Sequence, residues 1–176
     1  VVMDHARLLQ GAGYDVTILT TADEASREQK FSDTTLSVVA VRSLPCDRSF
    51  DVMVATFFTT VAFVLKYPRV HHRVYLVQGY ETDFLEYGHP LRFEAEGTYS
   101  PLLPIKKVTV SGWCKEWLKS RFGANADLIP NTLDRAQFPA KNRDFSGKIR
   151  ILIEGDPSNE FKNLDESFAI ANSLDR

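Results

Sequence analysis

The sequence has few cysteines, no long apolar run and little net charge. Cys46 and Cys114 are the only cysteines among 176 residues, and neither has a second Cys or a His at the spacing of zinc ligands. We therefore expect neither a disulfide framework nor a metal site. The longest mainly apolar run, residues 52–65, is shorter than the roughly 20 residues that cross a bilayer.

The small formal net charge of −2 gives no electrostatic basis for binding nucleic acid over the whole surface, so no nucleic-acid partner is expected. A local exception is residues 106–121, in which five basic residues oppose the single acid Glu116, a balance of 5 − 1 = +4. Such a patch could contact anionic lipid or a lipid diphosphate. A solvated helix face explains it equally well. We expect a cytoplasmic protein, with peripheral contact at the inner face of the membrane left open.

What the sequence does contain is enough apolar residue, 44%, to bury a core. Short runs rich in β-branched residues predict strands, and several are apolar almost throughout, which favours strands covered on both faces. The expected strands are residues 14–21, 36–42, 50–57, 73–78, 106–112, 126–131 and 148–155. Stretches with helical periodicity separate them, at residues 5–13, 59–68, 92–103, 112–123 and 163–174. The alternation predicts an α/β, doubly wound, mostly parallel sheet.

The two ends of the sequence suggest a division into domains. A helical pattern precedes the first strand, whereas in doubly wound domains a strand comes first, so we expect a missing first strand. Residues 139–147 have the polar, Pro- and Gly-bounded composition of a linker. The expected organisation is a first Rossmann-like domain over residues 1–140, a linker over 141–147, and the first βα unit of a second, truncated domain over 148–176.

Several motifs occur in an order that resembles a known enzyme family. "IPNTLD" at residues 129–134 is similar to the I-P-N-G-V-D motif of GT-B glycosyltransferases of family 4, with Thr132 and Leu133 in place of Gly and Val. "YLVQGYETDF" at residues 75–84 resembles the rhamnosyltransferase-like branch of that family. "HARLLQGAGYDVTILT" at residues 5–20 is similar to the family's first helix and following strand.

The resemblance implies transfer of a sugar from a nucleoside-diphosphate sugar, with retention of configuration and without an essential metal or other cofactor. The first domain would receive a glycan or lipid-linked acceptor for cell-surface polysaccharide synthesis, and the second would hold the donor. The family's catalytic acidic motif falls beyond Arg176, so the catalytic residues are unknown and this chain alone is expected to be inactive.

The resemblance implies that Lys162 and Gly155 bind the donor. In the family, a phosphate-binding lysine lies at the position of Lys162. A lysine before a helix N-terminus could meet the charge that develops on a departing diphosphate. The alternative is an ordinary solvated lysine. Asp156 departs from the family pattern, because an acid beside a diphosphate is unfavourable.

Five residues at or just beyond predicted strand ends are candidates for the acceptor cleft, since open α/β sheets bind ligands there. Gln78 can bond hydroxyls but cannot titrate. Glu81 could accept from an acceptor hydroxyl or cap a turn, and Ser111 could line the cleft or act as a helix N-cap. The remaining two are Tyr80 and Asn131; Asn131 could face the cleft or hold the turn between domains.

Two other functions stay open. A nucleotide-sugar epimerase can share this two-domain architecture, but it needs acid and base groups on opposite sides of the transferred atom. A non-catalytic glycan-binding α/β module would hold a saccharide without converting it.

Overall fold

A computed structural model describes residues 2–22, 35–131, 138–140, 146–147, 150–158 and 162–174. The contacts within the chain divide it into two units, residues 1–132 and 133–176, which are described separately. Most of the expected linker, residues 141–147, lies outside the described residues, as do Thr132 to Asp134 of the "IPNTLD" motif.

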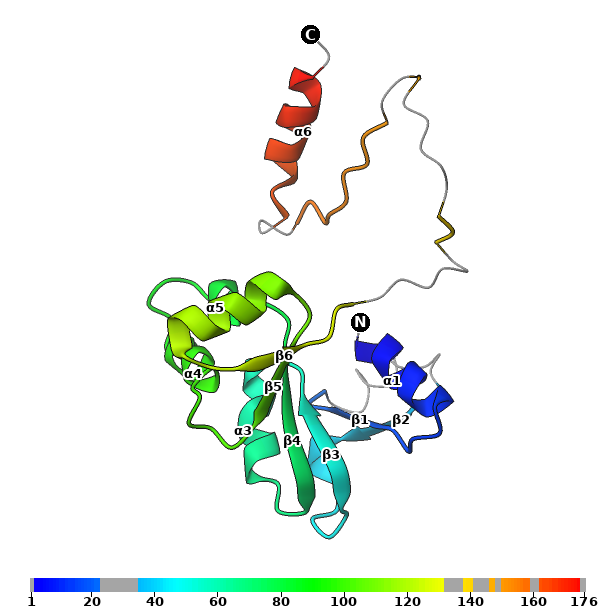
Figure 1. Cartoon of the computed structure of the whole chain (residues 1–176), viewed down its shortest axis with the longest axis vertical. Coiled ribbons are helices and arrows are strands. Elements are labelled where there is room, and N and C mark those ends of the chain that lie inside the picture. The colour runs from blue at the N-terminus through cyan, green and yellow to red at the C-terminus, as the bar shows by residue number, and fades with distance from the viewer. Residues whose placement is uncertain are drawn as a thin grey trace. The chain divides into compact units, whose positions relative to one another are not determined.

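The first unit is built from parallel strands and the helices between them (Figure 1). Strands β3, β4, β5 and β6 form one four-stranded sheet in that order, and β1 pairs with β2 in a separate two-stranded sheet. The prediction of an α/β fold with a parallel sheet is confirmed, and the architecture is consistent with a Rossmann-like fold. In chain order the elements are α1 (Val2–Gly11), β1 (Thr17–Thr20), β2 (Ser37–Ala40), η1 (Val41–Ser43), β3 (Phe50–Ala55), α3 (Phe58–Lys66), β4 (Val70–Val77), η2 (Glu81–Phe84), α4 (Leu91–Thr98), β5 (Lys106–Thr109), α5 (Gly112–Phe122) and β6 (Ala126–Leu128).

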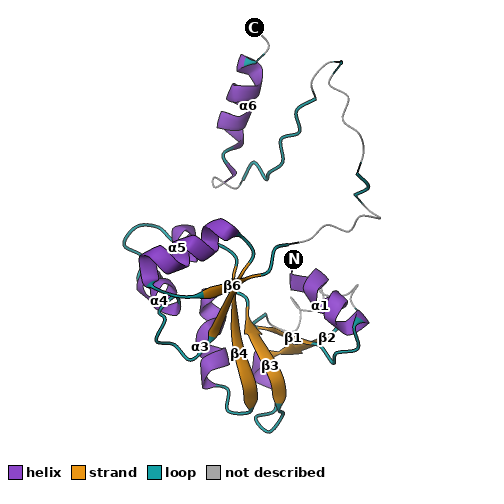
Figure 2. Cartoon of the chain, in the orientation of Figure 1, coloured by secondary structure: helices purple, strands orange, loops and turns teal. Residues whose placement is uncertain are grey.

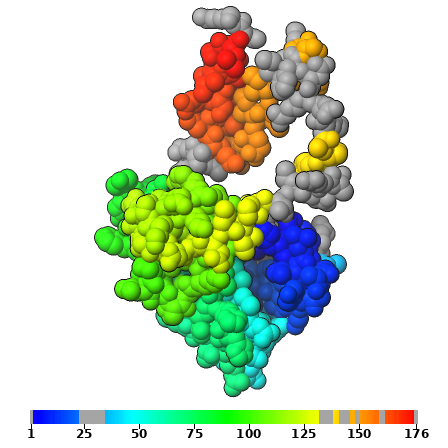
Figure 3. Space-filling model, in the orientation of Figure 1, coloured from blue at the N-terminus to red at the C-terminus, as the bar shows by residue number. Residues whose placement is uncertain are grey.

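One face of the four-stranded sheet carries the core. Figure 1 shows α3, α4 and α5 gathered on one side of the sheet, and the side chains beneath them are almost fully buried. Tyr75 and Val77 of β4 pack there with Val61 of α3, Tyr99 after α4 and Leu118 of α5. In the space-filling view these elements, coloured cyan to yellow, form one closely packed body (Figure 3).

The opposite face of this sheet differs from the expectation for a doubly wound domain. Val52 and Val54 of β3, which alternate with the buried Met53 and Ala55, are 50% and 46% exposed. The apolar runs in these strands predicted cover on both faces; Leu76 of β4, which alternates with Tyr75 and Val77, is buried as expected, whereas this part of β3 is not covered. Period-two alternation determines which side chains share a face, whereas cover depends on which other elements reach it.

The two-stranded sheet is joined to this core by side-chain contacts. Leu19 of β1 and Val39 of β2 pack against the core cluster. The Arg48 guanidinium, just before β3, donates a 2.9 Å hydrogen bond to Thr17 Oγ1 of β1. The Tyr67 hydroxyl, at the end of α3, donates to the carbonyl of Arg48 at 2.7 Å. These bonds connect β1 and α3 through the loop that leads into β3.

The second unit contains α6 (Leu164–Ser173) but no strand among its described residues (Figure 2). The prediction of a strand at residues 148–155 is therefore wrong for its described part. Residues 150–155 are irregular, and residues 148 and 149 lie outside the described part. A strand needs a neighbouring strand to satisfy its backbone groups. None of the described residues pairs with this segment, so an apolar, β-branched sequence alone does not produce a strand here.

Helix α5 begins and ends as its sequence predicts. The Ser111 side chain accepts a 3.1 Å hydrogen bond from the Cys114 amide at the N-terminus. At the C-terminus Gly123 has φ +66°, its amide donates to the Lys119 carbonyl, and the Ala124 amide donates to the Leu118 carbonyl. The bond from Gly123 to Lys119 is that of the αL cap, in which glycine takes the left-handed position without steric cost. By contrast, the helix expected over residues 92–103 ends at Thr98, because the chain turns there toward β5.

We predict that Gly123→Ala lowers the free energy of unfolding by about 1 kcal/mol, because a Cβ is disfavoured at positive φ. Urea denaturation of the wild type and variant measures the difference. Gly97→Ala in α4 is the matched control, since Gly97 does not have positive φ and has nothing within 4 Å of an added Cβ. Alanine there should raise stability by about 0.5–1 kcal/mol. Equal effects of the two variants would contradict the left-handed cap.

Candidate functional site

The strand ends of the four-stranded sheet gather the residues that the sequence predicted for an acceptor cleft. We call the segments that follow β3, β4, β5 and β6, residues 56–57, 78–84, 110–113 and 129–131, the carboxyl end of the sheet. All four strands are parallel, so these segments lie at the same end of the sheet. Hydrogen bonds join neighbouring strands there: Thr109 Oγ1 donates to the Val77 carbonyl at 2.9 Å, and the Ile129 amide donates to the Thr109 carbonyl at 2.8 Å.

Glu81 is the most constrained of these residues. Its side chain is almost fully buried, at 2% exposure. The Glu81 carboxylate accepts a 2.6 Å hydrogen bond from the Phe58 amide, at the first turn of α3, and a 2.8 Å hydrogen bond from the Tyr75 hydroxyl. The Glu81 backbone amide also has a partner within the protein, since it donates a 2.9 Å hydrogen bond to the Tyr99 hydroxyl.

The surroundings of Glu81 set its titration. Burial raises the pKa of Glu81 above its ordinary value of 4.5, and the hydrogen bonds from Tyr75 and Phe58 oppose that rise. Burial, reinforced by the nearby carboxylate, also raises the pKa of Tyr75, so the phenol stays protonated and donates. In the structure Glu81 joins α3, β4 and the segment after α4, and its carboxylate accepts from protein donors.

Tyr80 faces the helices. Its hydroxyl donates a 2.6 Å hydrogen bond to Glu96 Oε1 of α4, and its ring lies 4.9 Å from the Trp117 ring of α5. The Arg121 guanidinium lies 5.1 Å from the centre of the Tyr80 ring and forms an ion pair with Glu96 at 3.1 Å. Burial raises the pKa of Tyr80, and the bond to Glu96 acts in the same direction. Tyr80 therefore contributes to the packing of α4 against α5.

Gln78 and Asn131 are exposed at the carboxyl end of the sheet. The Gln78 side-chain amide donates to the Thr56 carbonyl at 3.3 Å, which places it between the ends of β4 and β3. Ser111 is half-buried, and its oxygen accepts from the Cys114 amide as the N-cap of α5. Of the five predicted cleft residues, Gln78, Ser111 and Asn131 thus lie beside the accessible surface, whereas Glu81 and Tyr80 are directed into the protein.

Aromatic side chains complete this surface and were not predicted as site residues. Phe57, after β3, and Phe84, in η2, are 36% and 56% exposed, and their rings stack at 6.4 Å with an interplanar angle of 26°. Trp113, in the first turn of α5, is 64% exposed and stacks on Trp117 at 6.1 Å. The signal in the sequence was positional, since Phe57 is the last residue of one predicted strand and Trp113 directly follows another.

The charge of the carboxyl end of the sheet is small. Glu81 is buried, and Asp83, the exposed acid beside Phe84, pairs with Arg92 at 3.7 Å. The other described side chains of these segments are uncharged. This surface offers aromatic rings, amides and backbone groups, which suit a neutral ligand with both apolar and hydroxyl-bearing faces.

The predicted donor-binding residues lie together in the second unit. A Cβ built on Gly155 would meet Lys162 Cβ at 3.0 Å and Leu164 Cδ2 at 2.8 Å, so Gly155 lies close against both side chains. Lys162 Nζ pairs with Glu154 Oε2 at 3.3 Å, with both side chains exposed. Asp156 accepts from the amide and hydroxyl of Ser158, and these hydrogen bonds lower the pKa of Asp156. The Asp156 carboxylate is thereby held in its own turn.

The first turn of α6 is acidic. Asp165 and Glu166 occupy it, and the Asn163 side chain donates to Glu166. Acids at a helix N-terminus interact favourably with the helix dipole and compete with an external anion for it. A diphosphate at this terminus would therefore depend on Lys162.

Comparison with protein-family models, with curated proteins and with solved structures found no match. In the part of the chain that the structure covers, no group of three or more His, Cys, Asp or Glu side chains is placed to hold a metal ion. Nor does any described helix have the length and apolar character needed to cross a membrane.

We predict that Glu81 makes the free energy of unfolding depend on pH, and that Glu81→Gln removes this contribution. Because the pKa of Glu81 is raised in the folded protein, the folded state holds the proton more tightly than the unfolded chain. The resulting stabilisation is complete below about pH 4.5 and is lost as the pH rises through the folded-state pKa. Gln keeps an oxygen to accept from Phe58 and Tyr75 without the charge.

Urea denaturation of both proteins between pH 4 and pH 8 measures this effect. The free energy of unfolding of the wild type, relative to Glu81→Gln, should fall as the pH rises above 4.5 and then level off. A difference that is constant across the range, or that rises with pH, would show that the buried carboxylate has no raised pKa.

Proposed function

We propose that this chain belongs to a retaining, metal-independent glycosyltransferase similar to GT-B family 4, in which the carboxyl end of the β3–β6 sheet binds the acceptor. The donor would be a nucleoside-diphosphate sugar, and the acceptor a glycan or lipid-linked saccharide. The observation that carries the proposal is the exposed, stacked pair Phe57 and Phe84 beside the amide of Gln78. The ordered motifs of the sequence support the same family.

This combination suits a sugar for two physical reasons. An exposed aromatic ring gives the apolar C–H face of a pyranose a flat surface to pack on, and it loses little conformational entropy in doing so. Amide groups such as those of Gln78 and Asn131 donate to and accept from hydroxyls without bringing charge. With Glu81 buried and Asp83 paired, little charge opposes a neutral saccharide.

In the proposed reaction the first unit acts mainly by positioning. Holding the acceptor hydroxyl beside the donor anomeric carbon converts an encounter between two molecules into a reaction within one complex. The departing diphosphate needs positive charge, and Lys162, beside Gly155, is our candidate to supply it. Because Lys162 pairs with Glu154, the diphosphate would replace that carboxylate as its partner.

A second candidate, a non-catalytic glycan-binding module, is favoured by one observation. Among the described residues at the carboxyl end of the sheet, no exposed carboxylate or histidine is free of an ion pair. Binding of a saccharide does not require such a group, whereas proton transfer to or from a sugar hydroxyl does. Glu81, whose acceptor positions are used by Phe58 and Tyr75, is not our candidate for that role.

We predict that the chain binds oligosaccharides and that Phe84→Ala weakens this binding about tenfold, because one face of the aromatic pair is lost. A glycan array followed by calorimetric titration of the best saccharide measures the affinity. Phe93→Ala in α4 is the matched control, because Phe93 is 86% exposed and lies outside the carboxyl end of the sheet. Equal losses in both variants, or no saturable binding by the wild type, would overturn the acceptor site.

The type of reaction is tested separately, by incubating the protein with a panel of nucleotide sugars with and without the bound saccharide. Release of nucleoside diphosphate that depends on the saccharide supports transfer. Conversion of the donor sugar without an acceptor identifies an epimerase. Because this chain alone is expected to be inactive, the assay is run on a protein that also carries the residues after Arg176, and there saccharide binding without either reaction supports the non-catalytic module.

A further inference from the structure

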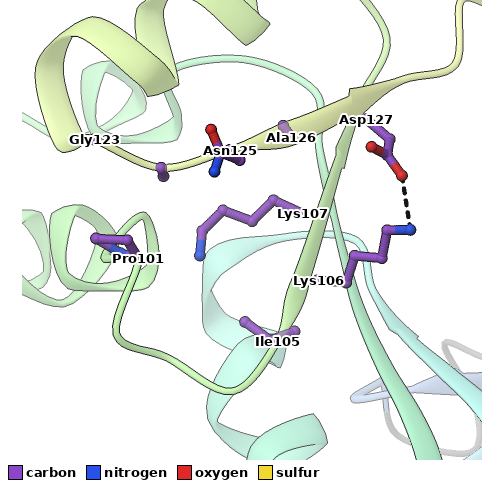
Figure 4. A pocket seen from close by; sticks show the side chains of 9 residues that line it. Pro101, Ile105, Lys106, Lys107, Gly123, Asn125, Ala126 and Asp127 are labelled. Atoms are coloured by element: carbon purple, nitrogen blue, oxygen red, sulfur yellow. Dashed lines mark ion pairs between the residues drawn. The ribbon is translucent and has the colours of Figure 1, made fainter.

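The opposite end of the same sheet has a hollow that the proposed function does not use. It lies at the amino ends of β5 and β6, has a volume of about 260 Å³, and opens to the surface (Figure 4). The loop before β5 contributes Pro101 and Ile105, and the segment between α5 and β6 contributes Asn125. Lys106 and Lys107, the first two residues of β5, form its floor and side.

Lys107 is unusual because a lysine is rarely buried without a carboxylate. The residue is only 4% exposed, and its ammonium donates one hydrogen bond, of 2.8 Å, to the Ser100 carbonyl. No ion pair joins Lys107 to an acid among the described residues. An ammonium has three donors, so two have no hydrogen-bond partner within the described segments of the chain. Burial lowers the pKa of Lys107, as expected for a cation removed from water without a counter-charge.

Asn125 places a second donor in the hollow. Its amide oxygen accepts a 3.0 Å hydrogen bond from Lys119 Nζ. The amide nitrogen therefore faces the other way, and Figure 4 shows it turned toward the ammonium of Lys107. An ammonium and an amide N–H₂ are both donors and cannot bond each other. An acceptor between them would satisfy both.

The charges around the hollow favour a negative acceptor. Asp127 is the one acid that lines it, and it pairs with Lys106 at 2.7 Å on the outer side, as the dashed line in Figure 4 shows. That pair is neutral overall, and the Lys106 ammonium lowers the pKa of Asp127, so the carboxylate stays ionised. The charge of Lys107 is left unbalanced, and Lys119, bound to the Asn125 oxygen, adds to it.

We propose that this hollow is a binding site for an oxyanion, a phosphate or carboxylate group whose oxygens accept from Lys107 Nζ and Asn125 Nδ2. Hydrogen bonds from a buried ammonium to an anion are among the stronger polar contacts in proteins. The site lies at the amino ends of the strands, whereas the acceptor site lies at their carboxyl ends, so the two sites are at opposite ends of the sheet. The proposal is independent of sugar transfer.

Titration of the whole chain with sodium phosphate, followed by ¹H–¹⁵N NMR, tests the site. Ionic strength is held constant with sodium chloride, so that screening does not change. We expect saturable shifts of the Asn125 side-chain amide and of the backbone amides of residues 123–127. Lys107→Met, which keeps the length of the side chain and removes the charge, should weaken phosphate binding at least about tenfold. Lys66→Met, at the exposed end of α3, should leave it within about twofold.

A second variant guards against misfolding of the first. Asn125→Ala keeps the buried lysine and should weaken binding about three- to tenfold, because one of the two donors is lost. A parallel titration with sodium acetate separates the sources of the oxygens. Saturation by both salts indicates a carboxylate-compatible site, and saturation by phosphate alone restricts it to phosphate groups. Equal phosphate affinity in the wild type, Lys107→Met and Asn125→Ala, or shifts that never saturate, would overturn the proposal.

Discussion

The buried carboxylate of Glu81 connects α3 to the central strand β4 of the first unit. The carboxylate accepts hydrogen bonds from the first turn of α3 and from the Tyr75 hydroxyl in the centre of the sheet. The backbone amide of Glu81 donates a hydrogen bond to the Tyr99 hydroxyl. Removing a carboxylate from water is costly, and this cost is offset only where donors and a favourable dipole replace the water. The N-terminus of α3 supplies both, because the Phe58 amide donates to the carboxylate and the helix dipole favours negative charge. This arrangement ties the start of α3 to β4.

The position of Glu81 also shapes the surface above it. Since its carboxylate is used inside the protein, the carboxyl end of the sheet presents aromatic and amide groups with little charge. Phe57 follows β3 and is adjacent to Phe58, whose amide Glu81 holds, and Phe84 ends the short η2 helix that Glu81 begins. The structural acid therefore fixes the two segments that carry the stacked rings. A surface of this kind fits a neutral saccharide better than a phosphate.

Lys107 and Glu81 are two buried ionisable residues on the same sheet with different partners. Glu81 has its donors within the protein, and its raised pKa reflects desolvation that those donors partly offset. Lys107 has one carbonyl partner among the residues that the structure describes, and it lines a hollow where a second donor faces it. An unbalanced ammonium beside open space is where an external oxyanion would lower the free energy most. This contrast is why the amino ends of the strands, usually the structural end of an α/β sheet, carry a proposed ligand site.

The sequence by itself determined much of the local structure: the strands of the first unit from their β-branched runs, and α5 from the helical periodicity of residues 112–123, because these depend on neighbouring residues and backbone conformation. It also located Gln78, Ser111 and Asn131 at strand ends. Only the tertiary structure decided that Glu81 and Tyr80 face inward, since Phe58, Tyr75, Tyr99 and Glu96 reach them from distant positions. The same holds for residues 150–155, whose composition is typical of a strand, because a strand forms only where another strand bonds to it, and for Lys107, whose burial depends on how the segment after α5 folds over β5.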